Sequence, residues 1–413
     1  MTDAGPPPSL LGGVRIIESS MLGPGALTTH LADLGAEVIK VEPPSGDYIR
    51  QMTWPIIDGV SLMHLHIGRG KRSIVLDISK PEGVATYLDL VSKADAVIEA
   101  MRPGGLAKKG LSFERIVEVN PKIVFCTISG YGATGPYAEM PSHGIAYDVW
   151  AGLVNPDEDE DGYSYIPDHP SMGMHAGPLF GALGVLAAII RARATGIPCQ
   201  MEVAQSDAAA AMDWYRIETW RAYERPESEV TGNASDNYRR RPPGTAGMRE
   251  SVRYQFYRST DGHILLQASE REFWENFCKG IGRADLFEAN PGNQYADHAV
   301  GNEPLHAELK DIFATRSSAQ WVAFGKENNV PIVNVNTPKT IADDPHFQHR
   351  FPWIPESRLG ADELPSPIKV VNEEAELPTH APTVGQHTDE VMRSVLGYDD
   401  DTIAQKKGAG AFG

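Results

Sequence analysis

VRIIESSMLGPGALTTHLADLGAEVIKVE, residues 14–42, has the pattern of one strand–helix–strand unit. Residues 14–18 form a short β-type run, and residues 25–34 form a helical segment. After a turn at Gly35, residues 37–42 form a second strand. Such a unit implies a parallel sheet with helices on its faces. The first turn, SSMLGPGA, lacks the three-glycine phosphate fingerprint, so the pattern does not indicate a dinucleotide fold of the usual kind.

The same alternation continues along the chain and predicts a doubly wound α/β domain. After residue 254 the pattern changes to paired strands and an amphipathic helix, which predicts a smaller α+β domain. Further strands are expected at residues 73–77, 96–99, 123–129 and 199–203, and further helices at 82–94, 113–120, from 145, 177–194, 206–224 and 270–281. The tail after residue 365 is predicted to hold one more strand and a helix at 388–396.

The length of the chain, 413 residues, exceeds one ordinary hydrophobic core, so two domains are expected. Residues 1–9 are rich in proline and are predicted to be disordered. NASDNYRRRPPGTAG, residues 233–247, is predicted to be the crossing between the domains, because its composition is that of a loop.

The charge balance excludes several classes of partner. With 37 Lys and Arg against 55 Asp and Glu, the net charge of −18 opposes general binding to nucleic acid or to an anionic membrane surface.

The three cysteines, Cys126, Cys199 and Cys278, lie far apart in the sequence and lack metal-ligand spacing, so we expect them to be buried thiols in a reducing cytoplasm. The chain shows no cationic leader and no run of roughly 20 apolar residues, which predicts a soluble cytoplasmic protein.

SMGMHAGPLFGALGVLAA, residues 171–188, joins a polar loop to a glycine- and alanine-rich apolar helix. Its small residues let another backbone or a ligand approach closely. His175 lies where this helix is expected to begin. A helix N-terminus leaves backbone N–H groups unpaired and favours an anion such as a carboxylate or phosphate. The alternative is a close-packed core helix that ends in a surface histidine.

Basic residues are expected to gather near the ends of strands. Lys71 and Arg72 are expected just before a strand, Arg102 lies in the turn MRPGG, and Lys108 and Lys109 begin the next loop. Loops at the carboxyl ends of parallel strands bind ligands, so several cations there indicate a polyphosphate. Scattered surface cations would give the same sequence pattern.

Imidazoles and carboxylates are concentrated in one turn-rich region that contains His143, Asp148, Asp168, His169 and His175. Histidine is the side chain whose ordinary pKa is nearest neutrality, so these residues are candidate proton carriers. Their spacings lack the helical arrangements of metal-binding histidines, so no metal site is predicted.

Motifs in a specific order run through nearly the whole chain and carry a resemblance to a known family. They are GVRIIE, LADLGAEVIKVEPPSGD, GKRSIVLD, ADAVIEAMRPGGLAKKGLS, NPKIVFCTISGYGATGP, ALGVLAAIIRARATG, YRSTDGHILLQASEREFWENFCKGIGRADL and APTVGQHTDEVMRSVLGY. In these motifs the chain resembles class III coenzyme A transferases. That family also contains carnitine-CoA transferases, formyl-CoA transferases and 2-methylacyl-CoA racemases.

The resemblance implies a large Rossmann-like α/β domain built from both ends of the chain, plus a smaller α+β domain. On this basis residues 10–232 belong to the large domain, 233–340 to the small domain with its linkers, and 341–413 to a C-terminal part that returns to the large domain. The family also implies an interlocked dimer, formed with a second copy or with a related subunit.

The resemblance implies coenzyme A as the cofactor, bound as an acyl-CoA substrate, and a carboxylic acid as the other partner. Lys71, Arg72, Arg102 and Lys108 match family positions near the nucleotide and its phosphates.

One departure from the family pattern concerns the catalytic carboxylate. Transferases of the family carry an aspartate ten residues before a glycine that matches Gly184, and Met174 stands there in this chain. A thioether cannot form the acyl intermediate. Ala100 replaces an asparagine that is frequent in the family. His143, however, matches the position of a catalytic histidine in the racemases.

Four hypotheses follow. The chain is a CoA transferase whose carboxylate comes from elsewhere, with Asp168 as the nearest candidate in sequence. It is instead a racemase or isomerase in which His143 and His175 move the proton alpha to the thioester. A third hypothesis is a non-catalytic subunit whose partner supplies the aspartate. The fourth is a binding protein that keeps the fold without the chemistry. Of these, we favour the transferase.

Overall fold

The structure, a computed structural model, describes residues 9–232, 238–241, 248–293, 296–374 and 376–413. The chain divides into two compact units. The first, the sheet unit, is formed by Met1–Met212 and His349–Gly413, and the second, the small unit, by Asp213–Gln348. The sequence analysis set these divisions near residues 232 and 340. The Pro-rich lead, apart from Ser9, and most of the crossing at 233–247 lie outside the described residues.

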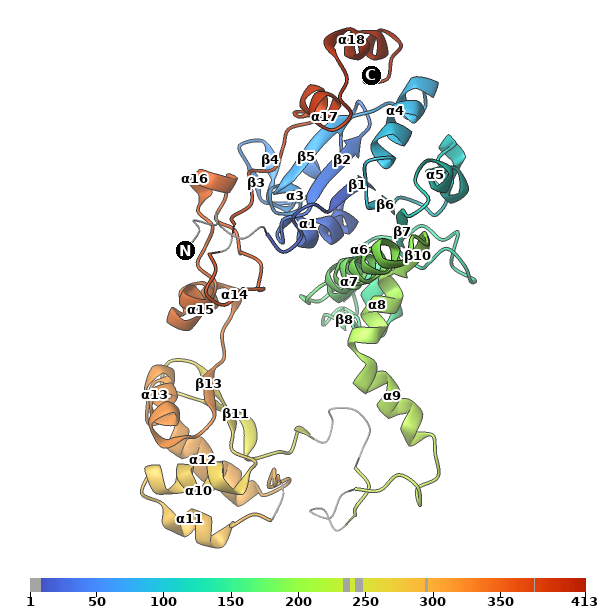
Figure 1. The fold of residues 1–413 in the computed structure, drawn as a ribbon. Helices are drawn as coiled ribbons and strands as arrows, with labels where there is room; N and C mark the ends of the chain where they lie inside the picture. Colours follow the sequence, from blue (N-terminus) through green and yellow to red (C-terminus); the bar gives the residue numbers. More distant parts are fainter. Residues whose placement is uncertain (1–8, 233–237, 242–247, 294–295, 375) are drawn as a thin grey trace. The chain divides into compact units, whose positions relative to one another are not determined.

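A six-stranded parallel sheet is the centre of the sheet unit (Figure 1), as the strand–helix–strand pattern predicted. Its strands are β1 Arg15–Ser20, β2 Glu37–Glu42, β5 Lys71–Val75, β6 Ala96–Ala100, β7 Val124–Ser129 and β10 Cys199–Ala204. Their order in space is β10-β7-β6-β1-β2-β5. This is the order of a Rossmann-type doubly wound sheet, in which the chain winds first to one side of β1 and then to the other.

Apolar side chains project from both faces of the sheet, and helices cover both faces because these side chains must be buried. Ile17 and Ile39 belong to a core formed with α4 Pro81–Val91, α5 Phe113–Val119 and the C-terminal helices α17 Thr388–Ser394 and α18 Asp400–Gly408. Ile16 and Val38 belong to a second core on the opposite face, formed with α1 Ala26–Ala32 and α7 Met172–Thr195. The last part of the chain therefore packs on the first (Figure 1), as the family resemblance implied.

The helices of the sheet unit are mostly short. They are η1 Gly23–Gly25, α1 Ala26–Ala32, α2 Ile49–Met52, α3 Leu62–Gly68, α4 Pro81–Val91, η2 Ala107–Lys109, α5 Phe113–Val119, α6 Gly144–Trp150, α7 Met172–Thr195, α8 Gln205–Met212, α16 Glu356–Leu359, α17 Thr388–Ser394 and α18 Asp400–Gly408. Two small antiparallel pairs join β3 Ile56–Ile57 to β4 Val60–Ser61, and β8 Asp157–Glu158 to β9 Ser164–Tyr165.

Helix α7 begins at Met172, earlier than the predicted start at residue 177. Proline is favoured in the first turn of a helix, but Pro178 lies inside α7. Because Pro178 has no N–H, it cannot make the helical hydrogen bond to the carbonyl of Met174. The first turn of α7 is therefore less constrained than the rest. By length and apolar composition α7 could cross a membrane, but half of that apolar segment is buried inside the unit, as in a core helix.

The small residues of α7 allow close packing, as predicted. A Cβ on Gly173 would lie 2.7 Å from Cβ of Tyr147. A Cβ on Gly177 would lie 2.6 Å from Cγ and 3.3 Å from Cα of Gln205, at the start of α8. These contacts bring α6 and α8 against the first two turns of α7.

Replacing Gly177 by alanine is expected to destabilise the protein by about 1–3 kcal/mol, because the added methyl group overlaps the Gln205 backbone and side chain. Urea unfolding measures the change. The matched control is Gly408→Ala at the end of α18, where a Cβ meets nothing within 4 Å. This control is expected to be stabilising by up to about 1 kcal/mol. Equal effects of the two substitutions would contradict the packing argument.

The small unit is built on a three-stranded antiparallel sheet with the order β11-β12-β13. Trp274, Phe277, Phe313 and Trp321 form the centre of its core. Its elements are α9 Trp214–Tyr223, β11 Tyr254–Arg258, β12 His263–Gln267, α10 Arg271–Gly280, α11 Ala284–Ala289, α12 Glu303–Phe313, α13 Ser318–Asn328, β13 Ile332–Asn334 and α14 Pro338–Ala342, while α15 Pro345–Arg350 spans the division at residue 348.

Three local predictions were wrong. The single helix expected at 206–224 is divided at Asp213 into α8 and α9. No strand occurs among the described residues after 365, where the many prolines remove backbone donors. Cys126 and Cys278 are buried, but Cys199 is partly exposed because it begins the edge strand β10.

Candidate functional site

The order of the sheet reverses between β1 and β6, and ligands of doubly wound sheets bind in the crevice at such a point, outside the carboxyl ends of the strands. β1 ends at Ser20 and leads into the segment Leu22–Gly25. β6 ends at Ala100 and leads into the turn that carries Arg102, whose side chain is exposed. The topology therefore places both loops at the candidate site.

Met174 lies in the first turn of α7, where two glycines leave room for its side chain. A Cβ on Gly23 would lie 2.9 Å from the Met174 Cε, and a Cβ on Gly144 would overlap its sulfur. The thioether thus fills the space between η1 and the N-terminus of α6. It is a tightly packed apolar side chain without a carboxylate that could form an acyl intermediate.

The two candidate histidines flank this contact along the chain. His143 precedes Gly144 as the N-cap residue of α6, and His175 follows Met174 in α7. Both residues are exposed, and neither imidazole makes a hydrogen bond with the part of the chain that the structure describes. Both are therefore available to a ligand.

The neighbouring carboxylates differ in their surroundings. Asp148 is fully buried, and its Oδ1 accepts a hydrogen bond of 2.7 Å from the backbone N–H of Gly173, so it caps the N-terminus of α7. Asp168 lies in the loop before α7, is exposed, and its side chain has no hydrogen bond or ion pair within the described residues. Of these two, Asp168 is therefore the carboxylate that a ligand can reach.

A basic pocket of about 480 Å³ lies at the carboxyl ends of β5 and β6. It is lined by Lys80, the N-cap residue of α4, by Lys108 and Lys109 of η2, and by Arg115 of α5. All four side chains are exposed, and none forms an ion pair in the described ranges of the chain. Four cations that face only one nearby carboxylate among the described residues, that of Asp77 close to Lys80 and Lys109, favour a ligand that carries several phosphates.

The comparisons with known proteins agree with this architecture. A sequence model of CoA-transferase family III matches residues 11–388. The chain belongs to CoA-transferase family III. It is 27% identical to the probable fatty acyl-CoA transferase Rv3272 of Mycobacterium tuberculosis, over 92% of this chain and 97% of that protein. It is 25% identical to human alpha-methylacyl-CoA racemase, over 96% of this chain and 95% of the racemase.

The fold of this family III chain also matches solved structures. A CaiB/BaiF family protein from Brucella suis superposes with a TM-score of 0.75, covering 94% of this chain and all of that one, at 23% identity. At this identity the likeness concerns the fold alone.

Lys71 and Arg72 are placed differently from the other predicted basic residues of the family III chain. They begin β5 instead of preceding it, so they lie at the amino end of the strand. Lys71 is buried, and its ammonium lies 2.8 Å from Glu18 and donates 2.7 Å to the carbonyl of Gly25. Arg72 pairs with Glu37 and Glu390. Carboxylates thus already occupy both cations, which counts against a role in holding phosphates.

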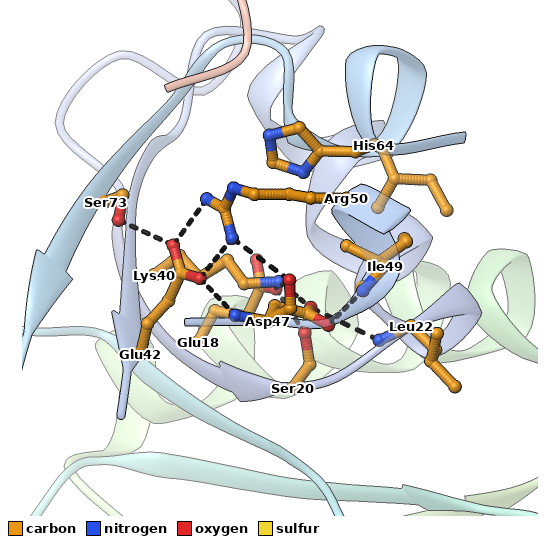
Figure 2. A network of polar contacts seen from close by, with 12 residues as sticks. Glu18, Ser20, Leu22, Lys40, Glu42, Asp47, Ile49, Arg50, His64 and Ser73 are labelled. Carbon is orange, nitrogen blue, oxygen red and sulfur yellow. Dashed lines mark hydrogen bonds and ion pairs between the residues drawn. The ribbon is translucent and has the colours of Figure 1, made fainter. Parts of the chain in front are cut away.

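Lys71 belongs to a buried charge network, part of which Figure 2 shows. The strand register places the network on one face of the sheet. Glu18 of β1 is the cross-strand partner of Lys40 in β2, and Lys40 is the partner of Ser73 in β5. Lys71 lies two residues before Ser73 in β5, so its side chain is on the same face. Burial alone would raise the pKa of Glu18, but the ammonium groups of Lys71 and Lys40 outweigh it and lower that pKa to about 2.

This lowered pKa predicts acid sensitivity. The carboxylate of Glu18 stabilises the fold at any pH above its unfolded value of 4.5, and this contribution is lost as the pH falls toward 2. Its size is on the order of 3 kcal/mol. Urea unfolding between pH 6 and 3 should therefore show a shallower acid limb for Glu18→Gln than for the parent. Glu118→Gln, at an exposed carboxylate of α5, should keep the parent slope, and the same slope in all three proteins would contradict the assignment.

Two cations of the basic pocket were missed by the sequence analysis. Lys80 and Arg115 lie outside the turn MRPGG, residues 101–105, and outside the loop that follows it, and neither belongs to a motif that predicts phosphate binding. The available signal was the position of Lys80, three residues after the end of a predicted strand and directly before Pro81, because proline is a frequent first residue of helices.

A second cavity, of about 520 Å³, lies in the small unit. It is lined by Arg253, Asn290 and Asp297 among others, and it includes none of the predicted site residues. No cluster of metal-binding side chains is found in the part of the chain that was described.

Proposed function

We propose that this chain is an acyl-CoA-dependent CoA transferase that moves coenzyme A between carboxylic acids. Membership of the family supports the class of reaction. The observation that carries the proposal is the basic pocket at the carboxyl ends of β5 and β6, because coenzyme A carries a diphosphate and a further phosphate on its ribose. Lys108 and Lys109 were expected near phosphates, and the pocket adds Lys80 and Arg115 to them.

In this proposal the nucleotide phosphates lie against the pocket, and the thioester reaches the crevice between the loops after β1 and β6. Arg102, exposed in the second of these loops, is placed to contact the diphosphate. We keep Lys71 and Arg72 only as residues that support the sheet, because their cationic groups are paired with carboxylates.

The proposed nucleophile is Asp168. Met174 cannot attack a thioester, and Asp148 is buried as the cap of α7. An oxygen of Asp168 attacks the thioester carbon, the C–S bond breaks, and coenzyme A leaves as a thiolate, which gives an acyl-aspartyl anhydride. The thiolate then attacks the aspartyl carbonyl and releases the first carboxylate. Coenzyme A is now joined to Asp168 as a thioester. The acceptor carboxylate attacks this thioester, which gives a second anhydride and the free thiolate. The thiolate then attacks the acceptor's carbonyl, so that the new acyl-CoA leaves and the carboxylate of Asp168 is restored.

Proton transfer is the second candidate function. His143 and His175 are both exposed beside the contact of Met174 with Gly144, and a base on each face of an enolate is what a racemase needs. Incubation with an acyl-CoA in deuterated water, followed by mass spectrometry, separates the two functions. Transfer of coenzyme A to an added carboxylate without alpha-proton exchange supports the transferase. Exchange without transfer would replace it by the racemase.

We propose that the working form is a dimer, interlocked as in the family, of two copies or of this chain with a related subunit. In the sheet unit, α7 exposes the large apolar residues Leu179, Leu183 and Ile190 on one side. In the small unit, α9 has no buried residue and exposes Trp214 and Trp220. Surfaces of this kind are usually covered by a partner.

The non-catalytic subunit remains the third hypothesis, and Met174 is the observation behind it. Light scattering of the protein expressed alone tests it. A stable homodimer that transfers coenzyme A excludes an obligate catalytic partner.

We also propose that the protein is cytoplasmic, because its three cysteines, all free in the structure, stay reduced there.

A further inference from the structure

The backbone of Leu22 has a conformation that is rare for a residue with a side chain. Its φ is 60° and its ψ is −150°, in a region that is populated almost only by glycine. Leu22 lies between β1 and η1, in the loop at the point where the order of the sheet reverses. Such strain persists only where the surroundings hold the backbone, and it is concentrated at functional sites.

One end of the loop is held by Asp47. The backbone N–H of Leu22 donates a hydrogen bond of 3.3 Å to Oδ2 of Asp47 (Figure 2). The same oxygen accepts a hydrogen bond of 2.6 Å from Nζ of Lys40, and the other oxygen accepts one from the backbone of Ile49. The backbone N–H of Asp47 donates to Glu42 at 2.8 Å. Asp47 is buried, so these contacts fix the orientation of its carboxylate.

The other end of the loop is held by Lys71. Its ammonium donates a hydrogen bond of 2.7 Å to the carbonyl of Gly25 and lies 2.8 Å from Glu18. Glu18 is in turn 3.6 Å from Lys40, which joins the two ends into one network. A carboxylate therefore holds the first N–H of the segment Leu22–Gly25, and an ammonium holds its last carbonyl.

The held segment faces the candidate site. Gly23, in its middle, packs so closely on Met174 that a Cβ there would lie 2.9 Å from Cε. A change in the backbone at Leu22 would move Gly23, and with it the side chain of Met174 in the first turn of α7. That turn already lacks one helical hydrogen bond because of Pro178.

We propose that Asp47 and Lys71 are positioning residues, which hold the segment Leu22–Gly25 in its strained conformation as the wall of the thioester site beside Met174. The part of this inference that concerns turnover rests on the proposed function. The part that concerns the backbone does not.

A double-mutant cycle tests the inference. Asp47→Ala removes the acceptor of the Leu22 N–H, and Leu22→Gly removes the cost of the strained backbone. Hydrogen exchange of peptides that cover residues 20–26 reports the loop directly, and kcat and KM for CoA transfer report the site. We expect D47A to speed loop exchange at least about tenfold and to lower kcat by a similar factor. In the L22G background both effects of D47A should be much smaller.

The control for relief of strain is Asn329→Gly, at a residue of positive φ in the small unit. N329G should leave the effects of D47A unchanged. Equal losses from D47A in the parent and L22G backgrounds would overturn the proposal, as would loop exchange that D47A does not alter. Should D47A fail to fold, Asp47→Asn takes its place, with the same rescue by L22G required. Rescued loop exchange in proteins that show no transfer would reject the proposed function and keep the positioning role.

Discussion

Asp168→Asn is expected to abolish the acyl-enzyme that hydroxylamine traps from an acyl-CoA, and to lower CoA transfer by about 10³-fold or more. The amide has the shape of the carboxylate but cannot attack the thioester carbon. Asp168 is exposed and unpaired within the described residues, so its loss should leave the fold intact. Mass spectrometry of the trapped hydroxamate, together with circular dichroism, measures both effects.

The matched control is Asp161→Asn, at another exposed aspartate of the loop between α6 and α7. It is expected to keep full trapping. A second variant sharpens the test: Met174→Asp in the D168N background introduces a carboxylate at the position where the family resemblance implies one. We expect it to restore trapping in part, since Gly23 and Gly144 leave room at that place. Unchanged trapping in D168N would remove Asp168 as the nucleophile.

Reversing two charges of the basic pocket should have the next largest effect. Lys108→Glu combined with Lys109→Glu is expected to raise KM for acyl-CoA about 100-fold, because two charge-assisted contacts are replaced by repulsion of the phosphates. The kcat at saturation should change little, since in the proposed function the pocket holds the nucleotide and not the reacting carbon. Steady-state kinetics over a range of acyl-CoA concentrations separates KM from kcat.

The control for the pocket lies at the opposite ends of the strands. Lys122 is exposed just before β7, at the amino ends of the strands. Lys122→Glu changes the net charge in the same direction without touching the pocket, so KM should stay within about twofold once salt screens long-range effects. An equal rise in KM for both proteins would mean that net charge, and not the pocket, governs binding.

Local patterns were sufficient for the sheet unit. The strand–helix–strand units predicted the parallel sheet because buried parallel strands are short, apolar runs separated by amphipathic helices. The glycines of residues 171–188 predicted close packing, and the structure shows Tyr147 and Gln205 against Gly173 and Gly177. Predictions were wrong where a local signal was ambiguous. The start of α7 was predicted at residue 177 because proline is typical of a first turn, but Pro178 lies inside the helix, which begins at Met172.

The candidate site was predicted only in part, because the partner of a charged group is not a local property. Lys71 was interpreted as a phosphate ligand from its type and place in the sequence. Its side chain instead lies on the face of the sheet that carries Glu18, and this acidic partner in the core keeps it away from the surface. Arg115 carried no motif, yet the packing of α5 beside α4 brings it to Lys80 and Lys108.

By itself, the sequence of this protein determined the family and the parallel sheet. These follow from residue identity and periodicity along the chain. Only the tertiary structure decided that Asp148 caps α7 while Asp168 has no polar partner among the described residues, and that a buried network holds Leu22 in a strained conformation. Those properties depend on which loops and strands meet in space, since burial and charge pairing are set by neighbours distant in the sequence.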